Sequence, residues 1–271
     1  MIEQLPQSPN QSGQDIATAQ AVVPSVVGDR IDIGTTHLSS DFVAAHVQSP
    51  LVPPTGGDFQ VAFPLKEEPD KIAFVLGDVS GHGHQASIHA AHLKAAIVGC
   101  LDEGLSPSDA LGYVNAAAEM DPNFPGFATV IAGTVETATG QIVYSSGGHE
   151  PALIASPPEA NQGGSETIQE LTSTGPPVGA FAAEEVRYTE NTAALSPGGT
   201  LLLYSDGVTE ARRGKTYVGI ERLRGWLARF LTLPPDRLVR KLLGSARAFV
   251  GGKKFRDDVA LLALRRRKHT N

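Results

Sequence analysis

The chain has 271 residues and a formal net charge of -7 at pH 7, with 41% hydrophobic and 19% charged residues. This composition is sufficient for a sizeable core and excludes a largely disordered chain. The negative charge argues against a surface that binds nucleic acid or an anionic membrane, since clustered Lys and Arg hold such partners.

Residues 1–30 are rich in Gln, Ser, Pro and Ala with little periodicity, which predicts a flexible leader before one domain over residues 31–268. The leader contains no apolar stretch long enough to span a bilayer and no pattern of an export signal. Cys100 is the only cysteine, which excludes an intrachain disulfide and a thiolate metal cage. We therefore expect a cytoplasmic protein.

Two hairpins are predicted from short apolar runs that flank polar turns. The first joins residues 59–65 to 71–77, and the second joins residues 128–135 to 141–146 across a turn that ends in Gly140. A final strand is predicted over residues 259–264. The basic run at residues 265–268 after it is interpreted as a solvated tail.

Apolar residues at helical spacing predict four helices, over residues 84–101, 107–120, 219–231 and 235–249. Ser106 is expected to cap the second of these. Residues 156–177 are rich in Gly and Pro and are interpreted as a surface excursion. Because the hairpins are grouped apart from the helix pairs, we expect an α+β sandwich with antiparallel sheets rather than a doubly wound parallel sheet.

Four acids stand at predicted strand ends beside glycine or another sharp turn former, namely Asp58, Asp78, Asp206 and Asp257. Asp58 and Asp78 are symmetric about the turn of the first hairpin, so antiparallel pairing would place their β-carbons about 4.5–5.5 Å apart. A divalent cation is the simplest partner that neutralises two such charges. Oxygen ligands without Cys or clustered His favour magnesium or manganese over zinc.

Each of these motifs has an ordinary explanation when it is taken alone. Asp206 precedes a glycine, and Asp-Gly is a common turn. Asp257 and Asp258 could be a solvated pair before a strand. The glycine-rich run at residues 77–83, which leads straight into a helix, is harder to explain in this way. One shared site accounts for all four acids at once.

Several histidines follow the glycine-rich run, and for His84, His89 and His92 a partly exposed helix surface is the better interpretation than a metal site. His82 is expected to border the site. His149 is expected to support a loop rather than to bind metal.

The run Gly-Asp-Val-Ser-Gly-His-Gly at residues 77–83 resembles the signature of the metal-dependent protein phosphatase family, in its bacterial SpoIIE and RsbU branch. Further motifs keep that family's order and spacing: Gly-Gly-Asp-Phe at 56–59, Phe-Ala-Thr at 127–129, Gly-Gly-His-Glu-Pro at 147–151, Leu-Tyr-Ser-Asp-Gly-Val-Thr-Glu at 203–210, and Asp-Asp-Val at 257–259. The resemblance covers residues 35–265. It implies a four-layer α-β-β-α sandwich in which helices flank two antiparallel sheets.

The resemblance also implies a ligand set for two divalent cations, manganese or magnesium. Asp58 and Asp78 would bridge or flank the ions, and the carbonyl of Val79 would complete one shell. Asp206 and Asp257 would supply the second ion. Asp257 is preferred to Asp258, because the family's ligand is the first acid of the pair and adjacent strand residues point to opposite faces. No other catalytic residue is implied, since two such ions can acidify and orient a water molecule.

The chain departs from the family pattern at two places. Ala260 stands where the family usually has Thr, and Gln60 or Val61 stands where a second Asp often follows the Gly-Gly-Asp-Phe motif. Neither is a primary ligand position, so these changes bear on hydrogen bonding around the metals and on the rate.

The expected activity is hydrolysis of phosphoserine or phosphothreonine on a protein, by analogy a phosphorylated anti-anti-sigma factor. A separate regulatory protein would control the enzyme, or it would be constitutive. Two other functions are considered: a non-catalytic module that binds a phosphoprotein or an anti-sigma kinase, and a serine hydrolase that uses Ser80 with His149 and Asp206. The presence of all four acids disfavours the first, and the lack of a Gly-x-Ser-x-Gly elbow disfavours the second.

Overall fold

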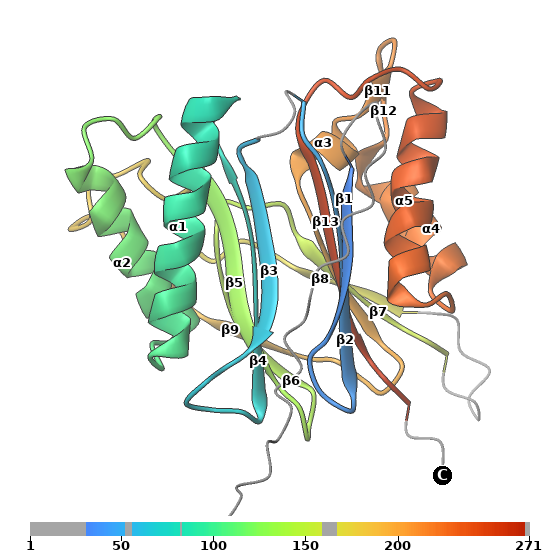
Figure 1. The fold of residues 1–271 in the computed structure, drawn as a ribbon, viewed down its shortest axis with the longest axis horizontal. Helices are drawn as coiled ribbons and strands as arrows, with labels where there is room; N and C mark the ends of the chain where they lie inside the picture. The colour runs from blue at the N-terminus through green and yellow to red at the C-terminus, as the bar shows by residue number, and fades with distance from the viewer. Residues whose placement is uncertain (1–30, 52–55, 82, 159–166, 269–271) are drawn as a thin grey trace, which may run out of the picture.

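The structure is a computed structural model that describes residues 31–51, 56–81, 83–158 and 167–268 (Figure 1). The leader predicted over residues 1–30 lies outside these residues, and so does His82. Within the described ranges, no helix is both long enough and apolar enough to cross a membrane.

Two antiparallel sheets form the centre of the molecule. One has six strands in the order β1-β2-β13-β10-β7-β8, and the other has five in the order β3-β4-β5-β6-β9. The strands are β1 (Asp32–His37), β2 (Phe42–Ser49), β3 (Asp58–Pro64), β4 (Lys71–Val79), β5 (Ala128–Glu136), β6 (Gln141–Gly147), β7 (Ala152–Ser156), β8 (Thr167–Leu171), β9 (Asn191–Ala194), β10 (Thr200–Tyr204) and β13 (Val259–Arg266). A separate short hairpin joins β11 (Arg212–Arg213) to β12 (Thr216–Tyr217).

Helices cover the outer face of each sheet. The helices are α1 (His84–Asp102), α2 (Pro107–Met120), the one-turn α3 (Asp206–Thr209), α4 (Gly219–Phe230) and α5 (Pro235–Phe249). Figure 1 shows α1 and α2 beside the five-stranded sheet and α4 and α5 beside the six-stranded sheet. One buried apolar cluster lies between the two sheets, and one lies under each helix pair. The predicted four-layer α-β-β-α sandwich is confirmed.

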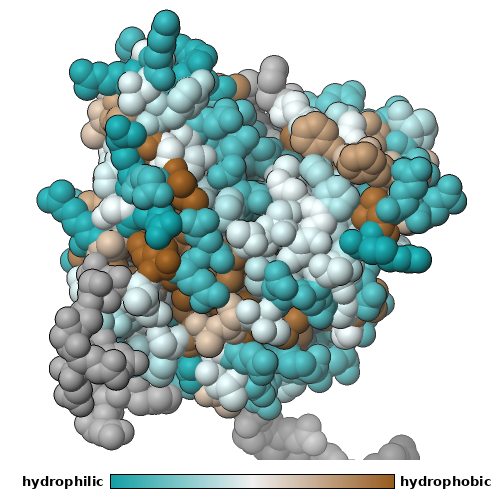
Figure 2. All heavy atoms as spheres, turned by 180° about the vertical axis from the view of Figure 1, so that it is seen from behind, coloured by the Kyte–Doolittle hydropathy of each residue, from teal (hydrophilic) through white to brown (hydrophobic). Residues whose placement is uncertain are grey.

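Local sequence explains why the helices begin and face where they do. The Ser106 side chain accepts a hydrogen bond from the backbone of Asp109 and caps α2, as predicted. In α5, Leu238, Leu242 and Ala246 recur at every fourth residue and are fully buried against the six-stranded sheet. Figure 2 shows the opposite face of the molecule, where hydrophobic side chains occur in small groups among hydrophilic ones.

Of the basic run at residues 265–268, only Arg267 and Lys268 are exposed as expected, because β13 continues through Arg266 and buries its side chain. The Arg266 guanidinium donates to the carbonyls of Ala138 at 2.6 Å, Thr139 at 2.6 Å and Leu195 at 3.0 Å. These carbonyls belong to the turn between β5 and β6 and to the residue after β9, so Arg266 links the two sheets. A guanidinium has five N–H donors and can satisfy several carbonyls at once.

Two further expectations need correction. The predicted surface excursion at 156–177 contains β8, which pairs with β7 and forms an outer strand of the six-stranded sheet.

Among the histidines of α1, His84 and His92 are exposed as predicted. His89 is buried, with its ring centroid 5.6 Å from that of Phe124 and its Nδ1 3.5 Å from an oxygen of Asp121.

Candidate metal centre

The elements that carry or adjoin the predicted acids meet at one end of the sandwich, where Figure 1 shows α3 and the start of β3 at the top. Asp58 opens β3 and Asp78 lies near the end of β4, and the two are register partners, as the symmetry of the hairpin predicts. Asp206 opens α3, and Ser205 alone separates it from the end of β10. Asp257 directly precedes Asp258 and β13, which pairs with β10.

Two glycines before Asp58 allow the backbone segments to approach closely. A β-carbon on Gly57 would lie 2.5 Å from the carbonyl oxygen of Val79, 3.3 Å from Oδ1 of Asp78 and 3.4 Å from the carbonyl oxygen of Gly81. Any side chain here would therefore collide with the turn after β4. These three oxygens all lie around Gly57. The motif alone did not indicate that the carbonyl of Gly81 lies there.

Asp58 is the most buried of the four predicted acids, with 4% of its surface exposed. Its Oδ2 accepts a hydrogen bond from the Ser205 hydroxyl at 2.7 Å, and that hydroxyl accepts one from the backbone N–H of Ala260 at 2.9 Å. The carbonyl oxygen of Asp58 accepts a hydrogen bond from the Gln48 amide at 2.7 Å. Oδ1 is buried and has no hydrogen-bond partner in the part of the chain that the structure describes. A buried carboxylate oxygen without a partner is costly, and a cation would satisfy it.

The surroundings of these carboxyl groups favour a positive charge. Burial, followed by the charge of Asp78, raises the pKa of Asp58 well above its ordinary value. Burial, followed by the charges of Asp206 and Asp257, raises the pKa of Asp78 to about 7. Burial and then Asp257 raise the pKa of Asp206 to about 6. Repulsion of this kind among several acids is typical of a site that binds a cation.

The acids do not form one closed cage. Among the described residues, no group of three His, Cys, Asp or Glu side chains is arranged to hold a single ion. The carboxyl groups interact electrostatically, and backbone carbonyl oxygens lie beside Asp78. The arrangement therefore fits ions that use one or two carboxylates each together with carbonyl oxygens or water.

Asp257 and Asp258 differ sharply in their surroundings. Asp258 is buried, and its two carboxylate oxygens accept hydrogen bonds from the backbone N–H groups of Leu51 and Gly57, each at 2.6 Å. Asp257 is exposed. Asp258 therefore holds the backbone of Gly57, just before β3, a role that the sequence did not indicate. Because both of its carboxylate oxygens already accept hydrogen bonds, Asp257 is the better candidate for the metal ligand.

Substituting each of these two acids by Asn is expected to separate their roles. Asp258→Asn should lower the free energy of unfolding by about 1–3 kcal/mol, since one buried N–H would face an amide NH₂ instead of an acceptor. Asp257→Asn should change the free energy of unfolding by less than about 0.5 kcal/mol, as expected for an exposed residue, and should weaken manganese binding. Urea unfolding in chelator and calorimetric titration with manganese measure the two effects. Unchanged manganese affinity in Asp257→Asn would show that Asp257 is not a ligand.

The residues of the alternative serine hydrolase have other partners. The Ser80 hydroxyl donates to the carbonyl of Pro125 at 2.7 Å. His149 is buried, its Nδ1 lies 2.8 Å from the Thr129 hydroxyl, and burial lowers its pKa to about 4. Thr129 is the register partner of Asp78, so His149 supports the strand beside the site. Among the described residues, Ser80 and His149 are not hydrogen-bonded to each other, so their contacts do not favour a serine hydrolase.

The sequence is similar to a family model and to known proteins. The sequence model described as Stage II sporulation protein E (SpoIIE) matches residues 68–267, which include Asp78, Asp206 and Asp257, whereas Asp58 precedes them. Phosphoserine phosphatase RsbU of Bacillus subtilis is 24% identical over 201 residues, which are 74% of this chain and 57% of RsbU. The chain thus spans less than two thirds of that relative.

Solved structures share the fold. The RsbU and RsbW domains of Rv1364c from Mycobacterium tuberculosis match with a TM-score of 0.69 and 26% identity, over 89% of this chain and 61% of that chain. The SiaA-PP2C domain of Pseudomonas aeruginosa matches with a TM-score of 0.68 and 22% identity, over 82% of this chain and 85% of that chain.

Proposed function

Because the chain belongs to the SpoIIE family, we propose that it is a metal-dependent phosphatase that hydrolyses phosphoserine or phosphothreonine on a protein substrate. One observation carries most of this proposal. Oδ1 of Asp58 is buried and without a hydrogen-bond partner among the described residues, and the charges of neighbouring acids, first Asp78, repel the ionised carboxyl group. A structural aspartate would be expected to have both oxygens satisfied.

We assign the proposed ligands as Asp58, Asp78, the carbonyl of Val79, Asp206 and Asp257, holding two divalent cations, manganese or magnesium. The donor set is all oxygen, as these hard ions prefer. Such ions, when bound, lower the pKa of water and offset the charge that develops on phosphoryl oxygens. Two dications would also balance the four carboxylates, so the acidic cluster would not repel a phosphate dianion.

The protein's own contribution is to hold the carboxylates in place. The Ser205 hydroxyl fixes Oδ2 of Asp58 and leaves Oδ1 for an ion. Asp258 anchors Gly57, whose backbone lies against the Val79 carbonyl, so one buried acid sets the position of two proposed ligands. Partners of this kind, one contact removed from the metal, orient its ligands and tune its affinity.

We propose a phosphorylated anti-anti-sigma factor as the physiological substrate. The resemblance to the SpoIIE and RsbU branch supports this choice, and so does similarity to RsbU, which is named a phosphoserine phosphatase. A regulatory protein that acts in trans is proposed on the same grounds. Both assignments rest on analogy with relatives rather than on the geometry of the site.

Phosphate release from a phosphoserine peptide tests the proposed activity. The purified chain should release phosphate in manganese or magnesium, lose this activity in excess chelator, and regain it when the ion is restored in excess. Activity that persists undiminished in chelator would contradict a metal mechanism. A chain that binds the peptide but releases no phosphate with any divalent ion would instead be the non-catalytic module.

A further inference from the structure

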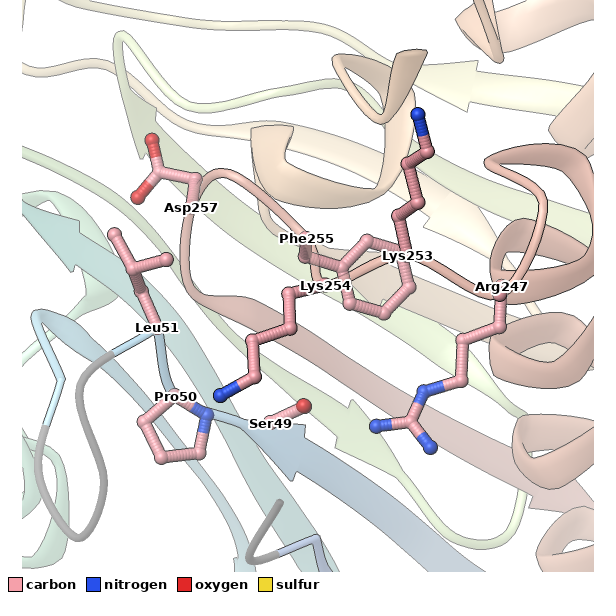
Figure 3. Close-up of a pocket in the computed structure, with 9 residues that line it drawn as sticks. Ser49, Pro50, Leu51, Arg247, Lys253, Lys254, Phe255 and Asp257 are labelled. Atoms are coloured by element: carbon pink, nitrogen blue, oxygen red, sulfur yellow. The ribbon is translucent and has the colours of Figure 1, made fainter. Parts of the chain in front are cut away.

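A basic groove lies beside the candidate metal centre, along the loop from α5 to β13, with the end of β2 on one side of the loop and the β11–β12 hairpin on the other. We define it by two adjacent cavities, which share Lys253, Lys254 and Phe255 in their walls. One cavity is also lined by Arg247 and by the proposed ligand Asp257 (Figure 3). The other is lined by five basic residues and no acidic one: Arg212, Arg213, Lys253, Lys254 and Arg256.

This concentration of positive charge is unusual in a chain whose formal net charge is -7. Arg213, Lys253 and Arg256 are exposed, and none of them takes part in the ion pairs found within the described residues. The fold brings the groove together from segments that are distant in sequence, so the charge is not visible as one basic run. Unpaired cations that line a concave surface attract an anionic ligand.

The cavities are too small for a whole small-molecule ligand. Their volumes are about 80 and 210 Å³, below the roughly 300–1,000 Å³ of ligand pockets. They could each accept one or two acidic side chains. Figure 3 shows Asp257 at one end of the first cavity, so this cavity reaches a proposed metal ligand. One peptide could therefore occupy both the groove and the metal centre.

We propose that the basic groove binds acidic residues of the protein substrate that flank its phosphorylated residue. This inference rests on the proposed phosphatase function. Lys253 is four residues from Asp257, a span of at most about 14 Å along an extended chain. Carboxylates within about four residues of a phosphoserine in the metal centre could therefore reach the groove. A nucleic acid is disfavoured, because its many phosphates would meet a chain that is acidic outside the groove.

Substrate preference tests the inference directly. Two phosphoserine peptides are compared, one with Asp and Glu around the phosphoserine and one with Asn and Gln at the same positions. The wild type should prefer the acidic peptide by at least about tenfold in kcat/KM, mainly through KM, and the preference should shrink at high salt. In the double variant Arg213→Glu with Lys253→Glu the ratio should fall to about one or below.

Lys66→Glu is a control for charge reversal outside the groove, since Lys66 is an exposed lysine in the turn between β3 and β4, at the far end of that hairpin from Asp58 and Asp78. It introduces the same charge reversal at one lysine and should keep the wild-type preference. Circular dichroism of both variants checks that they fold. A wild-type ratio near one, or a ratio unchanged in the double variant, would overturn the inference.

A binding measurement separates this inference from the proposed activity. Fluorescence anisotropy reports binding of the acidic peptide with serine in place of phosphoserine, and the wild type should bind it at least about tenfold more tightly than the double variant. Charge-dependent binding without phosphate release would refute the phosphatase proposal and leave the groove as a peptide site. Equal binding by both proteins would refute the groove. Tighter binding of a single-stranded oligonucleotide than of the peptide would also refute it.

Discussion

Substitution of Asp78 by Asn should lower phosphate release from a phosphoserine peptide by at least about a hundredfold in kcat. Residues that merely orient a metal ligand cost roughly 10–100-fold when they are changed, so loss of a ligand's charge should cost more. Asp78 is the register partner of Asp58 and interacts electrostatically with Asp206 and Asp257, so it is common to both parts of the proposed site. Steady-state kinetics in saturating manganese measures the effect.

Asp70→Asn is the matched control for this substitution. Asp70 directly precedes β4, the strand that carries Asp78, but it is exposed in the turn at the other end of the hairpin. The charge change is the same, and kcat should stay within about twofold of wild type, as expected for a surface position. If Asp78→Asn keeps wild-type activity in manganese, Asp78 is not part of the reaction and the proposed site is wrong.

The sequence predicted those parts of the fold that short-range patterns determine. The helices at 84–102, 107–120, 219–230 and 235–249 each end within one residue of their predicted bounds, because apolar residues at helical spacing define them. The pairing of Asp58 with Asp78 followed from the position of a single polar turn. In a hairpin, the turn fixes the register of both strands.

Features that depend on strands distant in sequence could not be predicted in this way. β10 and β13 are central strands of the six-stranded sheet, and their apolar runs are nearly continuous rather than alternating, so the pattern does not reveal their partners. Ser205 donates to Asp58 across 147 residues, and Asp258 accepts from Gly57 across 201. Both residues stand in recognised motifs, but their roles appear only when the sheets have paired. The basic groove was missed for the same reason.

Metal-free protein should lose stability relative to Asp78→Asn as the pH rises from about 4 to about 7. The pKa of Asp78 is raised from an ordinary 3.8 to about 7 by burial and by Asp206 and Asp257, so between these values the folded state binds more protons than the unfolded state. The free energy of unfolding then falls with increasing pH, and the contribution is fully lost above about pH 7. Asn cannot ionise, so the variant lacks this loss.

The comparison with the variant is needed because a second group acts in the opposite direction. Burial lowers the pKa of His149 from 6.5 to about 4, so below about pH 6.5 the unfolded state gains a proton that the folded state does not. That contribution raises stability as the pH rises, and it cancels in the difference between wild type and Asp78→Asn. Melting temperatures of both proteins in chelator, recorded from pH 4 to 8, give the difference.

Manganese should reverse the order of the melting temperatures of wild type and Asp78→Asn. At pH 7.5 in chelator the variant should melt at the higher temperature, because its folded state carries one fewer repelling charge. An ion that binds only the folded state at about 100 times its Kd adds roughly 2.7 kcal/mol, or about 5 °C or more in melting temperature. The wild type should gain this and the variant should gain less. A wild type whose melting temperature is independent of both pH and manganese would mean that these carboxyl groups neither repel one another nor bind a cation.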